Sequence, residues 1–457
     1  MRRAVGLLLV TLATTGCVRG RVAWQAGPDG VLLHDRAIRT ALAAQQFGSA
    51  FQLAQQPRTA VGDGLLATMH RGLTAYYAGD LATSTNAFAL AHLVADDRYT
   101  KSLRRGASAM LSGDAALAYD PTPAERWFIP LYGAFSFLRA NDREGAGVEA
   151  RRLAGLLQRA DERDDASTRS TRAALRYING ALFEQVGEFT DAEVAYRNAA
   201  LLAGDARILP LADSTPLDSL HGEVVVVLER GFAGHLEERG GDVWLDDSDV
   251  RFLRTANTDQ RWERANVLGG RLDQRPSRRT RLGGDDDDAG IQFLAVRYPV
   301  FVSDRGTLGS KDVDLADAFR AEWEREQPAR VARAVARGAL RLAALHAGKN
   351  VLDDASDEKK NGKKVAKAAL GVSLLGLGFS GAVVDRADTR SWSLLPGRIT
   401  LQRVRVPVGT APLIIEVDGT SLDLGPVTVR PRGVTVVQHR QWTPLSPAWR
   451  ATRRGTD

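Results

Sequence analysis

The chain is poor in cysteine, since Cys17 is the only one among 457 residues. No disulfide can therefore brace the fold within one chain, and no thiolate after residue 17 can act as a nucleophile or a ligand. The seven histidines are scattered without the His-x-x-x-His spacing of a zinc site. The aspartate-rich segments 242–249 and 285–288 also lack the spacing of a calcium loop. The sequence therefore predicts no metal and no other cofactor.

An excess of one charge is lacking as well. The 61 basic and 55 acidic residues leave a formal net charge of only +6. Such a balance is weak support for a polyanionic partner, and we expect no binding of nucleic acid. Hydrophobic residues make up 44% and charged residues 25%, as in soluble globular proteins. The length exceeds what one core usually holds, so about two or three domains are expected.

The first residues have the pattern of an export signal. Two arginines precede an apolar run, Val5 to Leu12, which is too short to span a bilayer, and the small pair Thr15-Gly16 stands before Cys17. This resembles a bacterial lipoprotein signal, in which the cysteine is acylated and becomes the new N-terminus. An ordinary secretory signal with a chance cysteine is the alternative. Under either interpretation the chain is exported, and under the first, residues 1–16 are removed.

The residue after the cysteine indicates which of the two envelope membranes would hold the anchor. Val18 stands where, by resemblance to enterobacterial lipoproteins, an acidic residue favours retention in the inner membrane. We therefore expect a protein anchored in the outer membrane through Cys17 and facing the periplasm. Thr14 departs from the resemblance, because Leu is usual at this position in the family.

Short motifs recur at a spacing of 34 residues in the N-terminal half: Gly72 and Gly79 recur as Gly106 and Gly113. This spacing is the period of the tetratricopeptide repeat, a helix-turn-helix in which small residues let two helices approach closely. We therefore predict a tetratricopeptide-like α-solenoid over 24–205, with a concave surface that binds a partner. A plain helical spacer without a ligand is the alternative.

The expected helix contacts are the small and aromatic positions of these copies. They are Gly72, Tyr76, Gly79, Phe88, Gly106, Gly180, Phe183, Gly187, Ala192 and Tyr196. The copy around Gly180 matches the repeat best, and a weaker copy runs from Ala134 to Ala146. Prolines within 119–123 interrupt the copy at Gly106, so the array is expected to be irregular.

Extended segments begin in a mixed region that we place at 206–346. The run from Glu223 to Leu228 contains four valines and predicts a strand buried on both faces. A second strand is expected at 291–301. Between the two, blocks of opposite charge at 273–290 predict a mobile loop.

Helical periodicity from 312 to 346 predicts an amphipathic helix pair hinged near Pro328. A lysine-rich linker and a glycine-rich apolar segment follow at 347–390. Within it, the stretch 365–384 is marginal as a membrane span because it contains a lysine and many small residues. We favour its burial within the protein or at the interface of a homo-oligomer, and membrane insertion is the alternative.

The tail, 391–445, alternates apolar and polar residues from Arg398 onward. It predicts about three or four antiparallel strands, which either form a small β-sandwich or cap a sheet begun by earlier strands. At its entry, Asp388 and Arg390 are expected to pair above Trp392. A structural corner is the favoured interpretation and a ligand site the alternative. The predicted fold class is therefore α+β with several domains.

Three segments resemble an uncharacterised family of bacterial lipoproteins. They are 119–126, 222–231 and above all 387–396, which reads Ala-Asp-Thr-Arg-Ser-Trp-Ser-Leu-Leu-Pro. The family joins a tetratricopeptide-like region to a conserved C-terminal region. Its genes often lie near a lipoprotein activator of penicillin-binding proteins. The resemblance implies an envelope role, with peptidoglycan synthesis as a hint, and supplies no catalytic residue.

The sequence contains no constellation typical of catalysis, so we expect no enzyme but a scaffold that binds an envelope protein in its helical groove. One alternative is an envelope hydrolase of the C-terminal half, with carboxylates such as Glu223, Glu229 or Asp388. Another is an accessory subunit of an export assembly. The segment Gly376–Gly381 matches the dinucleotide fingerprint, but no crossover helix follows it, which argues against a nucleotide cofactor.

Overall fold

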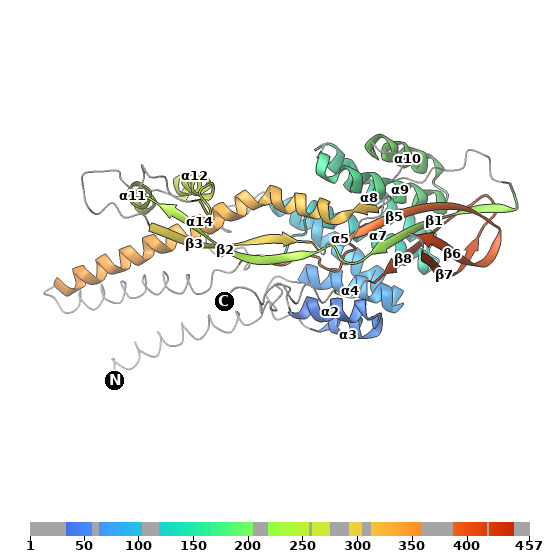
Figure 1. The fold of residues 1–457 in the computed structure, drawn as a ribbon, viewed down its shortest axis with the longest axis horizontal. Coiled ribbons are helices and arrows are strands. Elements are labelled where there is room, and N and C mark those ends of the chain that lie inside the picture. The colour runs from blue at the N-terminus through green and yellow to red at the C-terminus, as the bar shows by residue number, and fades with distance from the viewer. Residues whose placement is uncertain are drawn as a thin grey trace.

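The computed structural model shows an α+β protein with helices in its N-terminal half and strands mixed with helices after it (Figure 1). Cys17, Gly106, the segment 365–384 and most of the loop 273–290 lie outside the described residues. The described residues are 33–56, 64–102, 118–163, 165–203, 218–255, 258–274, 292–303, 312–357, 387–417 and 420–442.

Helices fill the described part of the chain up to Ala203, and each packs against the next one along the sequence. They are α2 (Leu33–Ala43), α3 (Phe47–Gln55), α4 (Gly64–Ala78), α5 (Leu81–Ser102), α7 (Pro123–Arg139), α8 (Arg143–Asp161), the short η2 (Ala166–Thr168), α9 (Arg169–Val186) and α10 (Phe189–Ala203). Of the prolines in 119–123, Pro123 is the first residue of α7, and Thr122 and Glu125 form a capping box around it.

One backbone turn recurs at the end of α2, α4, α7 and α9. Its residue has a left-handed φ, which is 56° at Gln45, 85° at Gly79, 59° at Asn141 and 95° at Gly187. The N–H groups of this residue and the next bond back to the helix, as in a Schellman ending. Gly79 and Gly187, expected at helix contacts, differ from that expectation: no atom lies within 4 Å of a Cβ built on either. The left-handed φ is what favours glycine there.

Two other glycines lie at close helix contacts. A Cβ on Gly72 would be 3.0 Å from the ring of Phe88, and one on Gly180 would be 2.7 Å from the ring of Tyr196. Each contact joins the first helix of a pair to the second, α4 to α5 and α9 to α10. The remaining described positions of the predicted set, Tyr76, Phe183 and Ala192, are buried.

A four-stranded sheet packs against these helices in the order β4-β5-β1-β8, and its strands come from distant parts of the chain. They are β1 (His221–Arg230), β4 (Asp312–Asp314), β5 (Arg398–Pro407) and β8 (Val434–Gln441). β1 is antiparallel to β5 and parallel to β8. The sheet therefore combines segments that sequence analysis placed at 206–346 and 391–445.

The tail does not form the antiparallel meander that its alternation predicted. Among the described strands of the tail, only β6 (Gly409–Val417) and β7 (Thr420–Val429) pair with each other, while β5 and β8 flank β1. The reason is that β1 is apolar on both faces and is therefore buried. Its backbone N–H and C=O groups then need a paired strand on each edge. Of the two arrangements left open, the tail completes a sheet begun by an earlier strand.

β1 is buried on both faces, as predicted. Val225 and Val227 belong to the core formed with the helices, whereas Val224, Val226 and Leu228 pack against the β6–β7 hairpin. The continuous valine run thus reflects a strand between two apolar layers rather than a strand with one solvated face.

A second core lies in an arm that extends from the helices and the sheet (Figure 1). The arm comprises the antiparallel pair β2 and β3, the helices α11 and α12, and the part of α14 that packs on them. These elements are β2 (His235–Leu245), β3 (Gln292–Val302), α11 (Asp247–Thr255), α12 (Thr258–Gly269) and α14 (Leu315–Asp357).

α14 is one continuous helix, so the predicted helix pair hinged near Pro328 is wrong. Proline inside a helix removes a hydrogen bond and costs about 3 kcal/mol. Packing on both sides of Pro328 offsets that cost. Before it, Phe319 packs against Phe128 of α7 with ring centroids 5.7 Å apart, and after it, Val335 is fully buried in the arm's core. Among the described helices, α14 included, none is both long and apolar enough to cross a membrane.

Candidate functional site

The four-stranded sheet covers one side of helices α7 and α9 in the N-terminal half. Tyr132 of α7 donates to Glu229 of β1 at 2.8 Å, and Gln185 of α9 accepts from the N–H of Val436 in β8 at 2.8 Å. The side of these helices that faces the sheet is therefore occupied, which removes part of the surface that sequence analysis assigned to a partner. A site for a partner has to lie elsewhere.

The segments 119–126, 222–231 and 387–396 meet in the fold. The N–H of Trp392 donates to Glu125 Oε1 at 2.6 Å, which joins the third segment to the first. Directly after the third segment, the N–H of Gly397 donates to the carbonyl of Arg230 at 3.0 Å, which joins it to the second. Their convergence makes them one structural centre between helices and sheet.

Asp388, Arg390 and Trp392 lie in this centre. Arg390 donates from Nε and Nη2 to the two carboxylate oxygens of Asp388, both at 2.8 Å, and is only 1% exposed. Trp392 is buried against the rings of Phe88 and Tyr132. The ion pair and the indole thus pack inside the protein, in the segment that precedes β5.

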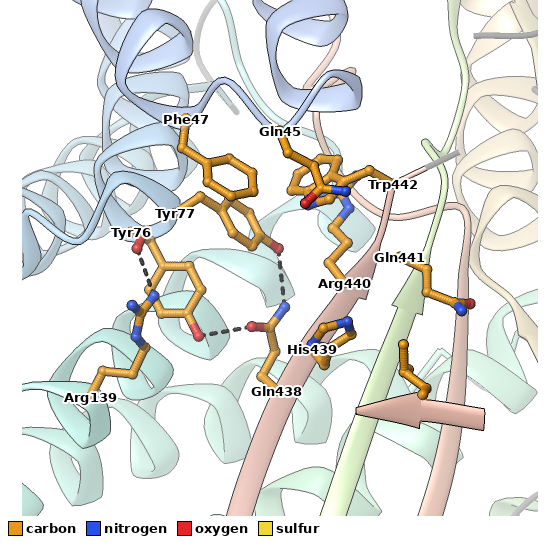
Figure 2. A pocket seen from close by; sticks show the side chains of 11 residues that line it. Gln45, Phe47, Tyr76, Tyr77, Arg139, Gln438, His439, Arg440, Gln441 and Trp442 are labelled. Carbon is orange, nitrogen blue, oxygen red and sulfur yellow. Dashed lines mark hydrogen bonds between the residues drawn. The ribbon is translucent and has the colours of Figure 1, made fainter. Parts of the chain in front are cut away.

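A pocket of about 610 Å³ opens where the ends of α4 and α7 meet the end of β8. Figure 2 shows side chains from these elements and from the α2–α3 turn surrounding one space. We call it the junction pocket. It is lined by Gln45, Phe47, Tyr76, Tyr77, Arg139, Leu422, Gln438, His439, Arg440, Gln441 and Trp442. No Asp or Glu is among these lining residues.

Three aromatic rings form one wall of the junction pocket. The ring centroids of Tyr77 and Trp442 lie 4.8 Å apart, and Phe47 lies 5.9 Å from Tyr77 and 5.8 Å from Trp442. Mutual packing fixes the orientation of the rings, so a ligand finds an apolar surface that is already formed.

A hydrogen-bond network fixes the adjacent floor (Figure 2). Gln438 accepts from the hydroxyl of Tyr76 at 2.9 Å and donates to the hydroxyl of Tyr77 at 3.0 Å. Behind it, Glu229 is fully buried and accepts from Gln438 and from Tyr132, both at 2.8 Å. Burial raises the pKa of Glu229, and the charge of Arg440 opposes this shift. Glu229 supports the floor and does not line the pocket.

Two guanidinium groups make the pocket cationic. Arg139 is exposed, stacks 4.6 Å from the ring of Tyr76 and donates to the Tyr76 carbonyl at 2.7 Å. Arg440 is only 4% exposed and lies 4.3 Å from the ring of Trp442. Its Nε and Nη1 have no hydrogen-bond partner among the described residues. Burial lowers the pKa of His439, so its imidazole is neutral near pH 7 and adds no charge.

This arrangement can stack, donate hydrogen bonds and attract an anion, but it lacks the paired carboxylates of a hydrolase. The candidates named from sequence lie in separate places: Glu223 pairs with Arg403, Glu229 lies behind the pocket, and Asp388 pairs with Arg390. Within the described ranges, no three His, Cys, Asp or Glu side chains gather as metal ligands.

Tyr76 was predicted only as a helix contact, and the other lining residues of the junction pocket were not predicted from the sequence. Two signals were present in the sequence. Tyr76-Tyr77 is an aromatic pair at a helix end, and the run from Gln438 to Trp442 breaks the apolar alternation of the last strand. Neither signal reveals that the two lie together.

Comparisons of the chain with protein-family models, with curated proteins and with solved structures found no significant match.

Proposed function

We propose that the protein is a non-catalytic scaffold of the bacterial envelope that binds a partner protein through the junction pocket. One observation carries this proposal: the pocket joins aromatic rings, amides and two guanidinium groups, without a carboxylate in its lining. Aromatic residues and arginine dominate the binding energy of protein interfaces because they combine large apolar area with directed hydrogen bonds.

The pattern before Cys17 supports the location. Acylation of this cysteine would hold the protein in the outer membrane with its folded part in the periplasm. The resemblance of the converging segments to envelope lipoproteins supports a role in the assembly of the envelope, with peptidoglycan synthesis as the process in question.

The helical half is, in this proposal, a tetratricopeptide-like solenoid that presents the pocket. Gln45 and Gly79 occupy the same turn position 34 residues apart, which is the period of that repeat. The close contacts at Gly72 and Gly180 support the same assignment.

Site-specific photocrosslinking in living cells tests the proposal. A photoreactive phenylalanine analogue is placed at Gln45, which is exposed and lines the pocket. Asn141 is the matched control, because it is exposed, occupies the same turn with the same left-handed φ and does not line the pocket.

We expect a discrete crosslinked protein from position 45 that is absent from position 141. Excess unlabelled wild-type protein should compete it away. Identical crosslinking patterns from the two positions, or no crosslinked protein from position 45, would contradict a partner site at the pocket.

A further inference from the structure

We propose that the junction pocket takes an acidic peptide segment in which a carboxylate stands next to an aromatic or large apolar side chain. This proposal rests on the proposed function, since it names the chemistry of the partner. It follows from charge, from apolar surface and from the place of β8 in the sheet.

The charge of the lining has one sign. Arg139 and Arg440 carry the only formal charges among the lining residues, and neither forms an ion pair within the described part of the chain. Glu229 offsets Arg440 only from behind the floor. A guanidinium matches the planar carboxylate with two parallel hydrogen bonds, and Arg139 is the exposed group that can make them.

The apolar surface favours a side chain beside that carboxylate. Phe47, Tyr77 and Trp442 form a wall of mutually packed rings with centroids 4.8 to 5.9 Å apart. Ring faces and edges bind another aromatic or a large aliphatic group by stacking. A pocket of about 610 Å³ has the size of sites that enclose a drug-sized group, which here corresponds to a few side chains.

The backbone context favours an extended peptide as the carrier. β8 is an edge strand of the sheet, and the pocket lies at its end. The N–H of Val436 in β8 is taken by Gln185, so an extended chain would run beside the edge beyond Val436, toward the pocket, and use main-chain hydrogen bonds there. Gln45 and Gln441 add amide groups that both donate and accept, as the N–H and C=O groups of a peptide require.

Selection from a random heptapeptide library tests the proposal. The full-length protein, purified from membranes in detergent, serves as bait. We expect enriched peptides that contain Asp or Glu next to an aromatic or large aliphatic residue. Selection needs no cellular partner, so its result is independent of the crosslinking at Gln45.

The most enriched peptide is then measured by fluorescence anisotropy against variants of the protein. We expect Arg139→Gln to weaken binding by about tenfold or more, and Arg139→Lys to restore part of it. Arg143→Gln is the matched control, because Arg143 is also exposed and donates to a backbone carbonyl, that of Gln185, outside the pocket. It should leave the affinity within about twofold of wild type.

Melting curves confirm that each variant is folded before its affinity is compared. No enrichment, enrichment of peptides without acidic residues, or equal losses in Arg139→Gln and Arg143→Gln would overturn the proposal. Complete displacement of the peptide by a neutral N-acetylglucosamine tetramer would instead assign the pocket to a glycan.

Discussion

Gly180 and Gly155 are both helical glycines, yet they have opposite surroundings. A Cβ on Gly180 would be 2.7 Å from the ring of Tyr196, which is held by its hydrogen bond to Glu184 at 2.8 Å, whereas nothing lies within 4 Å of a Cβ on Gly155. We expect Gly180→Ala to lower the free energy of unfolding by about 1–3 kcal/mol through overpacking. Gly155→Ala should raise it by up to about 1 kcal/mol through helix propensity. Urea denaturation of both variants checks this, and equal effects would contradict the assigned contacts.

A second prediction concerns the buried Arg390. Its guanidinium is buried and holds Asp388, whose side chain is only 13% exposed. Arg390→Ala would leave this carboxylate without its partner, so we expect a loss of about 3–5 kcal/mol in the free energy of unfolding. Chemical denaturation measures it. A mutant that unfolds like wild type but loses partner binding would make Asp388, Arg390 and Trp392 a binding site instead of a corner.

Some residue contacts could be predicted from sequence and others could not. The contacts of Gly72 and Gly180 could be predicted because the repeat pattern links a small residue to a large one about 16 positions later. The junction pocket could not be predicted from the sequence, because Arg139 and Arg440 lie on elements about 300 residues apart in the chain and only the tertiary fold places them together.

At the scale of elements, α14 joins the helical half to the arm, and Glu322 lies at this joint. Its burial raises its pKa from 4.5 to about 6; Glu326 and Glu125 add to the shift, and Arg163 opposes it. A carboxyl group with a raised pKa binds more protons when folded than when unfolded. Its contribution to stability is therefore complete below about pH 4.5 and is lost as the pH rises to about 6.

Replacing Glu322 by Gln removes this titration. We expect the melting temperature of wild type, compared with that of Glu322→Gln, to fall between about pH 4.5 and about pH 6 and to stay level above it. Differential scanning calorimetry at a series of pH values checks the difference. A constant difference over this interval would show that Glu322 titrates normally.

Elements with a strong local pattern were predictable. The four valines of β1 indicate a strand between two apolar layers, and the structure has it. The partners of that strand were not predictable, because alternation in the tail is the same whether its strands pair with one another or with β1. The continuous helix through Pro328 was not predictable for a related reason. The packing that offsets the cost of this proline involves elements that are distant in the sequence.

For the whole molecule, the proposed acylation of Cys17 would decide in which compartment the protein works. If it is acylated, cells given radiolabelled palmitate should label the wild type and not Cys17→Ser, and the variant should move from the membrane to the soluble fraction. Each methylene that enters the bilayer contributes about 0.8 kcal/mol, so two or more acyl chains hold the protein firmly. Absence of label from the wild type would rule out the anchor and leave the pocket proposal intact.

Contacts between segments that are far apart in the sequence join the helices to the sheet. Glu125, Arg230 and Trp392 come from three parts of the sequence and meet between helices and sheet. This centre supports the elements whose ends form the junction pocket. We therefore assign stability to the converging segments and binding to the pocket beside them.

The affinity of the crosslinked partner, once purified, is the most direct test of that assignment. Isothermal titration calorimetry would compare its dissociation constant for wild type, Arg139→Gln and Arg143→Gln, all with equal melting temperatures. We expect a dissociation constant about tenfold or more higher for Arg139→Gln and an unchanged one for Arg143→Gln. Equal affinity for all three proteins would contradict binding through the junction pocket.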